Sequence, residues 1–452
     1  MNNLNEQKTK SIGKRISESA TLKMVIIGVL NLILMIPMLY VSDLIHERKL
    51  RKKEVIREVN DDWGERVKLI PPVLVIPYKV YSERTYYVNG EKKVEKIYKG
   101  DNYLYVLPEN LQMDIDLKAL PKHRGIYQTS VFDAKNYIKG SFVRPDIKST
   151  GINQEDLKWN QAFIFFKTTN NKGIKDRIIL NTPEKKMDFL LQESGGKGSY
   201  RKFQTAVFNK NPFEKNNSFD FTMNYNVKGS RGYFVIPTAR TTQVNMKSNW
   251  VDPKFSGAFL PDNNDKILPA GKGFDAHWKI IDYQRPFKKM YVNNFPDILD
   301  DYAFGIHFFV PVDNYLKAER ASKYAYLVIF LTFLVFFIIQ QVGKVSMHTF
   351  HYFLIGLALV IFYTLLISIS EHTNFNFSYI ISSIATILLI SLYSKSILNT
   401  KKFSLYIFVI LSLLYFYIYV IIQLENYALL VGSIGLFLIL SGIMYSSRKI
   451  KW

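Results

Sequence analysis

The chain has 452 residues, with 59 Lys and Arg against 38 Asp and Glu, and its formal net charge is +21 at pH 7. It has no cysteine, which excludes disulfide bonds, thiolate metal sites and a cysteine nucleophile. The positive charge flanks apolar segments, which favours membrane anchoring over nucleic-acid binding, so we expect no nucleic-acid partner. The remaining positive charge indicates either a Lys-rich solvated surface or a weak attraction to anionic lipid headgroups.

Six apolar segments are long enough to cross a membrane, since a helix needs about 20 apolar residues for this. Their predicted bounds are 24–41, 326–340, 352–370, 379–393, 403–424 and 428–445. Most charged residues lie between the first and second segments. The predicted fold is therefore a membrane protein of α + β structure. It has one N-terminal transmembrane helix, a large water-facing domain and a C-terminal bundle of five transmembrane helices over residues 326–445.

The loop charges predict that both termini are cytoplasmic. Loops 341–351 and 394–402 and the tail 446–452 carry Lys or Arg, whereas loops 371–378 and 425–427 carry none, and positive loops stay inside. The basic run 47–53 disagrees with this orientation, but a long domain translocates largely regardless of its charge. Residues 1–23 are then a cytoplasmic tail. Residues 24–41 are interpreted as an uncleaved anchor, because Ser42-Asp43-Leu44 offers no small-residue cleavage site.

Residues 42–67 are predicted to continue the first span as a stalk helix, because apolar residues recur there at helical spacing. Residues 68–312 are predicted to form a β-rich, antiparallel, sandwich-like domain, because short alternating runs are separated by Gly, Asn and Pro. Asn89-Gly90 between two such runs predicts a hairpin. Further strands are predicted in 113–117, 126–143, 162–167, 221–227, 232–237 and 241–247. Residues 144–220 are polar and give no clear β topology.

The segment 248–278 concentrates aromatic residues beside Asp, Asn and His. Its candidate interaction residues are Trp250, His277 and Trp278. Clustered aromatic rings can form a platform for carbohydrate or peptide. The favoured alternative is structural, with the aromatic residues anchoring a long loop onto the edge of a sheet.

Residues 313–325 lead from the domain directly into the second span and are predicted to form a coupling helix. Asp313 suits the N-cap, with Lys317 four residues later. We expect a rigid connection between domain and bundle, although Lys and Tyr residues are also ordinary anchors at a membrane interface. The candidate residues of this helix are Asp313, Tyr315, Lys317, Glu319, Arg320, Lys323 and Tyr324.

Glu371 and His372 follow the third span and are further candidates for a charge pair, a proton relay or a contact with the exported domain. A helix end that simply reaches water would explain them equally well.

No HExxH, P-loop, nucleophile-elbow or Rossmann motif occurs, and the seven histidines are scattered. We therefore expect no enzyme activity, no catalytic residue, no cofactor and no metal. Transport is disfavoured because the spans lack charged residues at their centres and, apart from Pro37 in the first span, lack proline.

Taken together and in order, several segments resemble the CreD family of bacterial inner-membrane proteins. They are Glu18 to Met24, Glu47-Arg48, Trp63-Gly64, Pro72 to Tyr78, Ser248 to Trp250, Phe259 to Pro261, Gly273-Phe274, Ala276 to Trp278, Pro311 to Ala325, Leu331 to Phe333 and Ser370 to Thr373. The chain departs from the family pattern at Pro71, at Lys451 and over 144–220.

The resemblance implies a multi-pass protein of the bacterial inner (cytoplasmic) membrane, with residues about 42–325 in the periplasm. It also implies a link to cell-envelope integrity, to tolerance of certain colicins and to responses to β-lactams, downstream of the CreBC two-component system. It carries over no catalytic residues.

We expect a non-enzymatic protein that binds or scaffolds envelope components, with the lipid bilayer and other envelope proteins as partners. The alternative is a transporter of a small solute or an envelope component that the periplasmic domain gates. An exported hydrolase is a third and weaker possibility, and the ligand and oligomeric state stay open.

Overall fold

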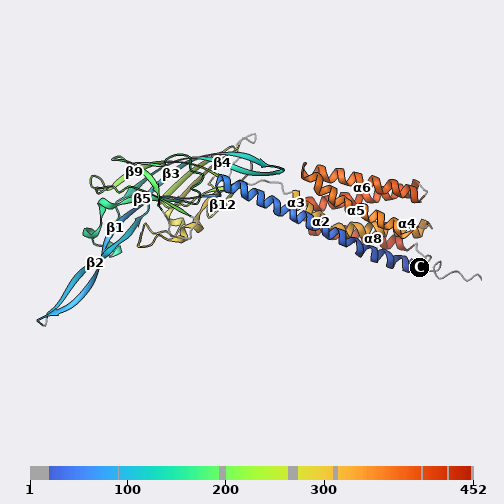
Figure 1. The fold of residues 1–452 in the computed structure, drawn as a ribbon, viewed down its shortest axis with the longest axis horizontal. Helices are drawn as coiled ribbons and strands as arrows, with labels where there is room; N and C mark the ends of the chain where they lie inside the picture. The colour runs from blue at the N-terminus through green and yellow to red at the C-terminus, as the bar shows by residue number, and fades with distance from the viewer. Residues whose placement is uncertain are drawn as a thin grey trace, which may run out of the picture. The chain divides into compact units, whose positions relative to one another are not determined.

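The structure is a computed structural model, and it describes residues 20–89, 91–192, 200–262, 273–308, 314–343, 345, 347–398, 401–424 and 427–448. The chain divides into two compact units, one of Met1–Glu54 with Val312–Trp452 and the other of Val55–Pro311. The first unit is helical and the second is mostly β-structure (Figure 1). The predicted combination of membrane helices with a large β-rich domain is therefore confirmed.

The first apolar segment belongs to one long helix, α2 (Ala20–Trp63), of 44 residues. Its apolar first half continues without a break into the charged stretch that was predicted as a stalk. The helix ends at Trp63 because Gly64 has a positive φ of 85°, a conformation that glycine adopts without strain. A side chain at Gly64 would also collide with Asn170. The stalk therefore ends before residue 67, where the first strand begins.

The rest of the helical unit consists of a short helix and five long apolar helices. They are α3 (Asn314–Lys323), α4 (Ala325–Gly343), α5 (Thr349–Ser370), α6 (Phe375–Leu398), α7 (Lys401–Gln423) and α8 (Ala428–Ser447). Together with α2, six helices in the described part of the chain are long and apolar enough to cross a membrane. Each predicted span lies within one of these helices, except that Leu424 falls one residue beyond the end of α7, and all six helices extend past the predicted span at one end or both.

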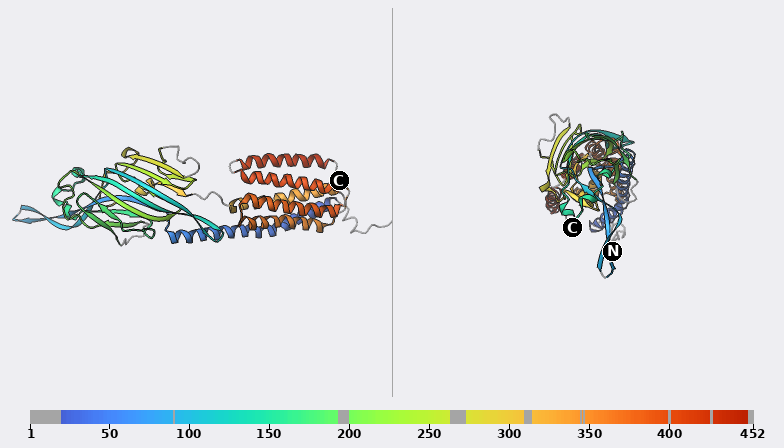
Figure 2. Two further views of the ribbon diagram at one scale, coloured as in Figure 1. Left: turned by 90° about the horizontal axis from the view of Figure 1, so that it is seen from above. Right: turned by 90° about the vertical axis from the view of Figure 1, so that its left-hand side faces the viewer.

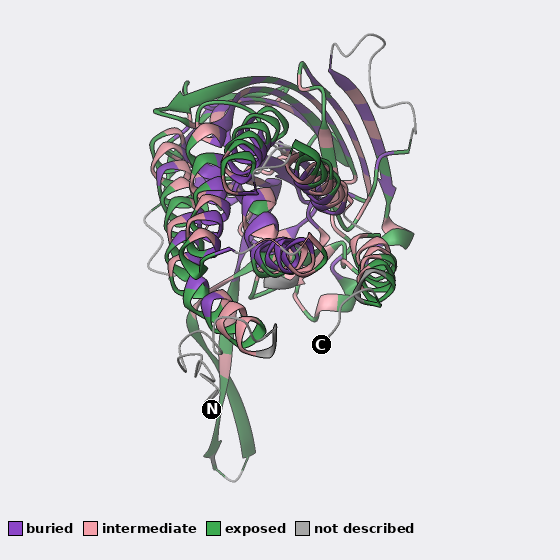
Figure 3. Cartoon of the chain, turned by 90° about the vertical axis from the view of Figure 1, so that its right-hand side faces the viewer, coloured by how far each residue is buried: buried purple, intermediate pink, exposed green. Residues whose placement is uncertain are grey.

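Burial differs strongly among these helices. In Figure 3 the bundle helices carry buried residues where they face one another and exposed residues on their outer sides. The buried face of α6 is lined by small hydroxyl residues, which let neighbouring helices approach closely. These residues are Ser378, Ser382, Ser383, Thr386, Ser391 and Ser394. By contrast, no residue of α8 whose burial is described is buried, so α8 is the most loosely packed helix of the bundle.

The β-rich unit contains fifteen strands in the described residues. They are β1 (Val67–Val88), β2 (Glu91–Val106), β3 (Asn110–Arg124), β4 (Tyr127–Val143), β5 (Phe163–Thr168), β6 (Ile179–Asn181), β7 (Lys186–Leu191), β8 (Arg201–Thr205), β9 (Ser218–Ser230), β10 (Gly232–Val235), β11 (Thr241–Ser248), β12 (Pro253–Gly257), β13 (Phe274–Ile281), β14 (Met290–Val292) and β15 (Phe304–Phe308). Short 3₁₀ helices connect some of them, and the longest in the described residues is η6 (Asp297–Tyr302).

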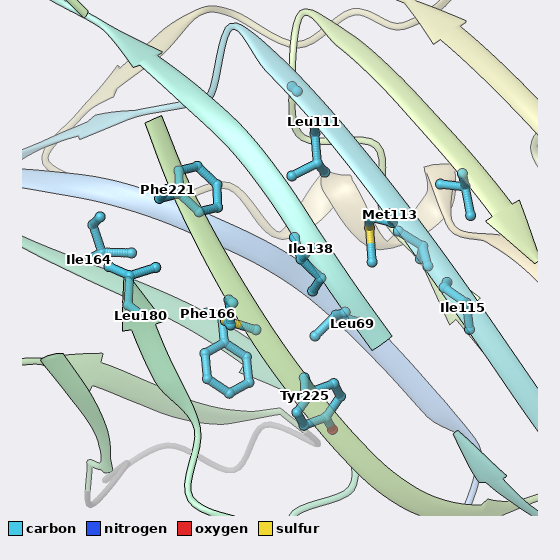
Figure 4. Close-up of a cluster of buried hydrophobic side chains, with 14 of the residues drawn as sticks. Leu69, Leu111, Met113, Ile115, Ile138, Ile164, Phe166, Leu180, Phe221 and Tyr225 are labelled. Atoms are coloured by element: carbon cyan, nitrogen blue, oxygen red, sulfur yellow. The ribbon is translucent and has the colours of Figure 1, made fainter. Parts of the chain in front are cut away.

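These strands form one continuous path in the order β12-β15-β10-β1-β5-β8-β7-β6-β9-β4-β3-β11-β13, with β2 paired to β1 and β14 paired to β2. The path curls until its two halves face each other across one apolar core. Leu69, Phe166, Ile138 and Phe221 project into this core from different strands (Figure 4). Most pairings are antiparallel, as predicted, but β1 with β10 and β3 with β11 are parallel.

The hairpin predicted at Asn89-Gly90 is confirmed by the pairing of β1 with β2. Asn89 has a φ of 53°, the left-handed conformation that hairpin turns require. The outer half of this hairpin projects from the domain as a two-stranded arm (Figures 1 and 2). At the other end of β1, the last residues of α2 lie against the β3–β4 hairpin, where Arg124 pairs with Glu58 at 3.3 Å. The Lys122 ammonium lies 5.0 Å from the Trp63 ring.

One sequence interpretation was wrong. The aromatic segment 248–278 is not simply a long loop, because it contains β12 and β13. β13 alternates between buried residues and residues that are at least partly exposed. Its outward positions hold the polar residues Asp275, His277 and Lys279, so the segment has the alternation that is typical of a strand. Residues 144–220, which gave no clear β topology, contain β5, which matches the strand predicted at 162–167, together with β6 to β8 and the start of β9.

Candidate functional site

Polar side chains of α3 bind α2 on one side and the ends of bundle helices on the other. The Lys49 ammonium lies 2.6 Å from Glu319 Oε2, and Arg48 Nε lies 3.5 Å from Glu371 Oε1. The Tyr315 hydroxyl donates a hydrogen bond of 3.4 Å to the same oxygen of Glu371. We call this set the latch, and its residues are Arg48, Lys49, Lys52, Tyr315, Glu319 and Glu371.

The sequence of α3 explains how it docks. Tyr315, Ala318 and Ser322 recur at helical spacing and are buried, and the small residues let α3 approach its neighbours closely. Asn314 donates hydrogen bonds of 3.0 Å to the carbonyls of Ser370, the last residue of α5, and of Thr373 just beyond it. α3 is thereby fixed to the end of α5.

A second attachment lies at the opposite side of α3. Lys317 donates a hydrogen bond of 2.9 Å to Gln423 Oε1 at the end of α7. Gln423 in turn donates to Asn376 of α6. The ends of α5, α6 and α7 are therefore joined to one short helix.

The electrostatics of the latch favour charged side chains. The Lys49 hydrogen bond lowers the pKa of Glu319 most, and Lys323, which lies 3.5 Å from the same carboxylate, lowers it further. The Lys52 ammonium lies 5.7 Å from the centre of the buried Tyr315 ring, a cation–π geometry. The Glu371 side chain is only 15% exposed, so its pairing with Arg48 is less screened than a surface ion pair.

The other predicted residues of this region are less central. Asp313 lies outside the described residues, and Arg320 is half-buried on α3. Tyr324 forms a one-residue turn between α3 and α4, so the expected coupling helix is separate from the membrane helix that follows. His372 is exposed, and no side-chain hydrogen bond or ion pair described for this part of the chain involves it.

The three aromatic-segment candidates do not form a single platform. Trp278 is 1% exposed and packs inside the core against Phe255 and Phe304. His277 is on the opposite face of the same strand, as alternate residues of a strand must be. Trp250 packs edge-on against Phe308 and donates its indole N–H to the Asp252 carbonyl. The tryptophans therefore serve packing, which agrees with the favoured structural interpretation.

His277 instead marks a polar face that the sequence interpretation missed. Its Nδ1 lies 2.5 Å from Asn245 Oδ1, and Asn245 donates to Asp114 Oδ1 at 2.7 Å. Beside this row is a groove of about 410 Å³ across β3, β4, β9 and β11. Its polar lining includes Asp114, Asp116, Lys135, Asn224, Asn226 and Asn245. Asn and Asp are rare in strands, so their repetition at outward positions was the signal that could have revealed it.

The groove presents amide, carboxylate and ammonium groups at one surface. Such a set suits hydrogen bonding to a hydroxyl-rich or peptide ligand. Within the described ranges, no three His, Cys, Asp or Glu residues group closely enough to hold a metal ion.

Two comparisons with known proteins extend these observations. The family model described as inner membrane protein CreD matches residues 19–452. The chain is also 28% identical, over 439 residues, to the inner membrane protein CreD of Escherichia coli (strain K12). The match covers 93% of this chain and 91% of that relative, so both the bundle and the β-rich unit are included.

Proposed function

Because the chain belongs to the CreD family of inner membrane proteins, we propose that it is a non-enzymatic protein that supports cell-envelope integrity. In this proposal the β-rich unit is periplasmic and binds or scaffolds envelope components. The bundle holds it in the inner membrane, with both termini in the cytoplasm. Tolerance of envelope stress, including β-lactams and colicins, would follow from that role.

The latch is the observation that carries this proposal. The chain leaves the membrane helices through α2 and returns to them at α3, so these are its two connections to the β-rich unit. Lys49–Glu319 and Arg48–Glu371 hold the two connections to each other and to the end of α5. A load on the β-rich unit would reach the bundle through this set of contacts. The polar groove gives the same unit a surface on which a hydroxyl-rich or peptide ligand would bind.

The test is a charge exchange in the latch. Lys49→Glu or Glu319→Lys alone places like charges side by side and is expected to reduce survival under envelope stress several-fold. The double variant restores an opposite-charge pair and is expected to recover most of the loss. Survival is measured in cells that lack the native protein, with membrane levels of each variant determined in parallel.

Glu54→Gln is the matched control, because Glu54 pairs with Arg51 within α2 itself and is 59% exposed. It should leave survival unchanged. Normal survival of both single variants, or a double variant no better than the singles, would overturn the coupling role of the latch.

A second candidate function is transport through the bundle, and buried hydroxyl groups favour it. The hydroxyls of Tyr363, Ser382 and Tyr415 are buried and have no hydrogen-bond partner among the described residues. A polar solute or water could satisfy them. Against ion-coupled transport, the described residues of α4 to α8 hold no Asp, Glu, Lys or Arg except near helix ends.

A further inference from the structure

An apolar cavity of about 720 Å³ lies within the bundle, between α4, α7 and α8. Its walls are aliphatic and aromatic side chains with few polar atoms. Representative lining residues are Phe336, Ile339, Tyr406, Leu414, Ile439 and Gly442. In a bilayer such a space is open to lipid tails rather than to water, because the helices that enclose it are apolar enough to cross the membrane.

The shape of the cavity comes from uneven packing of α8. Tyr417 of α7 donates a hydrogen bond of 2.7 Å to the Gly432 carbonyl. A Cβ at Gly435 would lie 2.2 Å from the Tyr417 ring, so the two helices touch there. At Gly442, two turns further along α8, a Cβ would meet nothing within 4 Å. α8 is therefore in close contact with α7 at Gly435 but leaves open space at Gly442.

Two lysines lie near one end of the cavity, in the first turn of α7. Lys402 precedes the wall residue Tyr406 by four positions, so it lies one turn beyond the wall on the same face of α7. Lys401 is beside it, and both side chains are exposed. α7 begins at Lys401, and the positive end of a helix dipole also favours an anion near this first turn. An apolar slot with two lysines about one helical turn beyond its wall complements a lipid with an anionic headgroup.

We infer that this cavity binds an anionic phospholipid, with an acyl chain between α4, α7 and α8 and the phosphate beside Lys402 and Lys401. Basic pockets between transmembrane helices are a known form of lipid headgroup site. In the predicted orientation this end of α7 faces the cytoplasm, so the lipid would come from the inner leaflet. The site does not depend on the envelope role, because it uses only bundle residues.

The experiment uses the full chain purified in detergent and titrated with phosphatidylglycerol or phosphatidylcholine, with retained lipid measured by native mass spectrometry. Phosphatidylglycerol should be retained preferentially. Lys402→Gln should reduce that preference about fivefold, since one Lys near an anionic headgroup contributes about this factor. Gly442→Leu fills the open space and should reduce retention of both lipids.

Lys395→Gln and Ser441→Leu are the matched controls. Lys395 is an exposed residue near the end of α6, and Ser441 is an exposed residue of α8 that does not line the cavity. Neither should change lipid retention. All four variants are compared only if they reach the membrane in equal amounts and elute at the same volume after purification. Equal retention of the two lipids by the unmodified protein would overturn the anionic preference. Unchanged retention by Gly442→Leu would overturn the cavity as the site.

Discussion

Asn136 is the centre of a buried hydrogen-bond network in the β-rich unit. It accepts a hydrogen bond of 2.7 Å from the Tyr233 hydroxyl and donates to the Tyr225 carbonyl. The Tyr225 hydroxyl in turn lies 2.9 Å from Thr168 Oγ1. All four residues are buried, and burial raises the pKa of Tyr233 well above its ordinary value, with Tyr225 adding to the effect. The network links β4, β5, β9 and β10 across the apolar core.

Tyr233→Phe tests that network at a single atom. It leaves the ring in place but deprives the buried Asn136 oxygen of its donor, which costs about 1–3 kcal/mol. We expect a lower unfolding temperature for the β-rich unit. Tryptophan fluorescence provides the measurement. Trp63, Trp159, Trp250 and Trp278 all belong to this unit. Tyr283→Phe removes a hydroxyl from a side chain that is 91% exposed and should change nothing. Equal melting of the two variants would show that the network adds no stability.

At the scale of an element, one carboxylate attaches η6 to the sheet. Asp300 Oδ2 lies 2.7 Å from the Lys68 ammonium of β1, and Asp300 Oδ1 accepts a hydrogen bond from Tyr200. Burial raises the pKa of Asp300, but the hydrogen bonds from Lys68 and Tyr200 outweigh it and lower the pKa overall. The charged form is therefore the one that holds η6 in place.

The sign of the pH dependence follows from this lowered pKa. The stabilisation is fully present above the unfolded-state pKa of about 3.9 and is lost as pH falls through the lower folded-state value. Asp300→Asn should therefore melt below the unmodified protein at pH 6, and the difference should shrink as pH falls towards 3. Tryptophan fluorescence over that range provides the measurement. A difference that stays constant with pH would mean that the charge of Asp300 is not what holds η6.

The sequence predicted those elements whose signals are local. The membrane helices have continuous apolar runs, and the β1–β2 hairpin has its turn residues between alternating runs. The parallel pairing of β3 with β11 had no such signal, because it joins residues 110–117 to residues 241–248. β13 was missed although Asp275, His277 and Lys279 alternate with buried residues as in a strand, because the segment was interpreted as an aromatic loop. For β3 and β11, tertiary pairing rather than local propensity determines the neighbour.

The residues of the candidate site were also predicted only where the signal was local. The polar face of α3 was predicted from its own sequence, and Glu371 was identified as a candidate without its partner. Arg48 and Lys49 were not identified, because the basic run 47–53 was interpreted only as a conflict with the loop charges. In the structure two residues of this basic run have acidic partners, since Arg48 pairs with Glu371 and Lys49 with Glu319. Acids from two other helices thus neutralise charge that the sequence alone left unexplained.

For the whole molecule, the decisive comparison is between the full chain and residues 1–322 in cells that lack the native protein. The shorter chain keeps α2, the β-rich unit and most of α3, but it lacks Glu371, the Ser370 carbonyl and Gln423, to which α3 binds. We expect it to reach the membrane yet to protect cells under envelope stress less than the full chain.

Two other outcomes of this comparison would each assign the activity to a different part of the chain. Full protection by residues 1–322 would make the β-rich unit a tethered binder that needs only α2, and the latch would then be a structural contact. Complete loss of protection, together with normal survival of the Lys49→Glu and Glu319→Lys variants, would instead place the activity in α4 to α8. The buried hydroxyls of Tyr363, Ser382 and Tyr415 would then be the first residues to replace, since transport of a polar solute would depend on them.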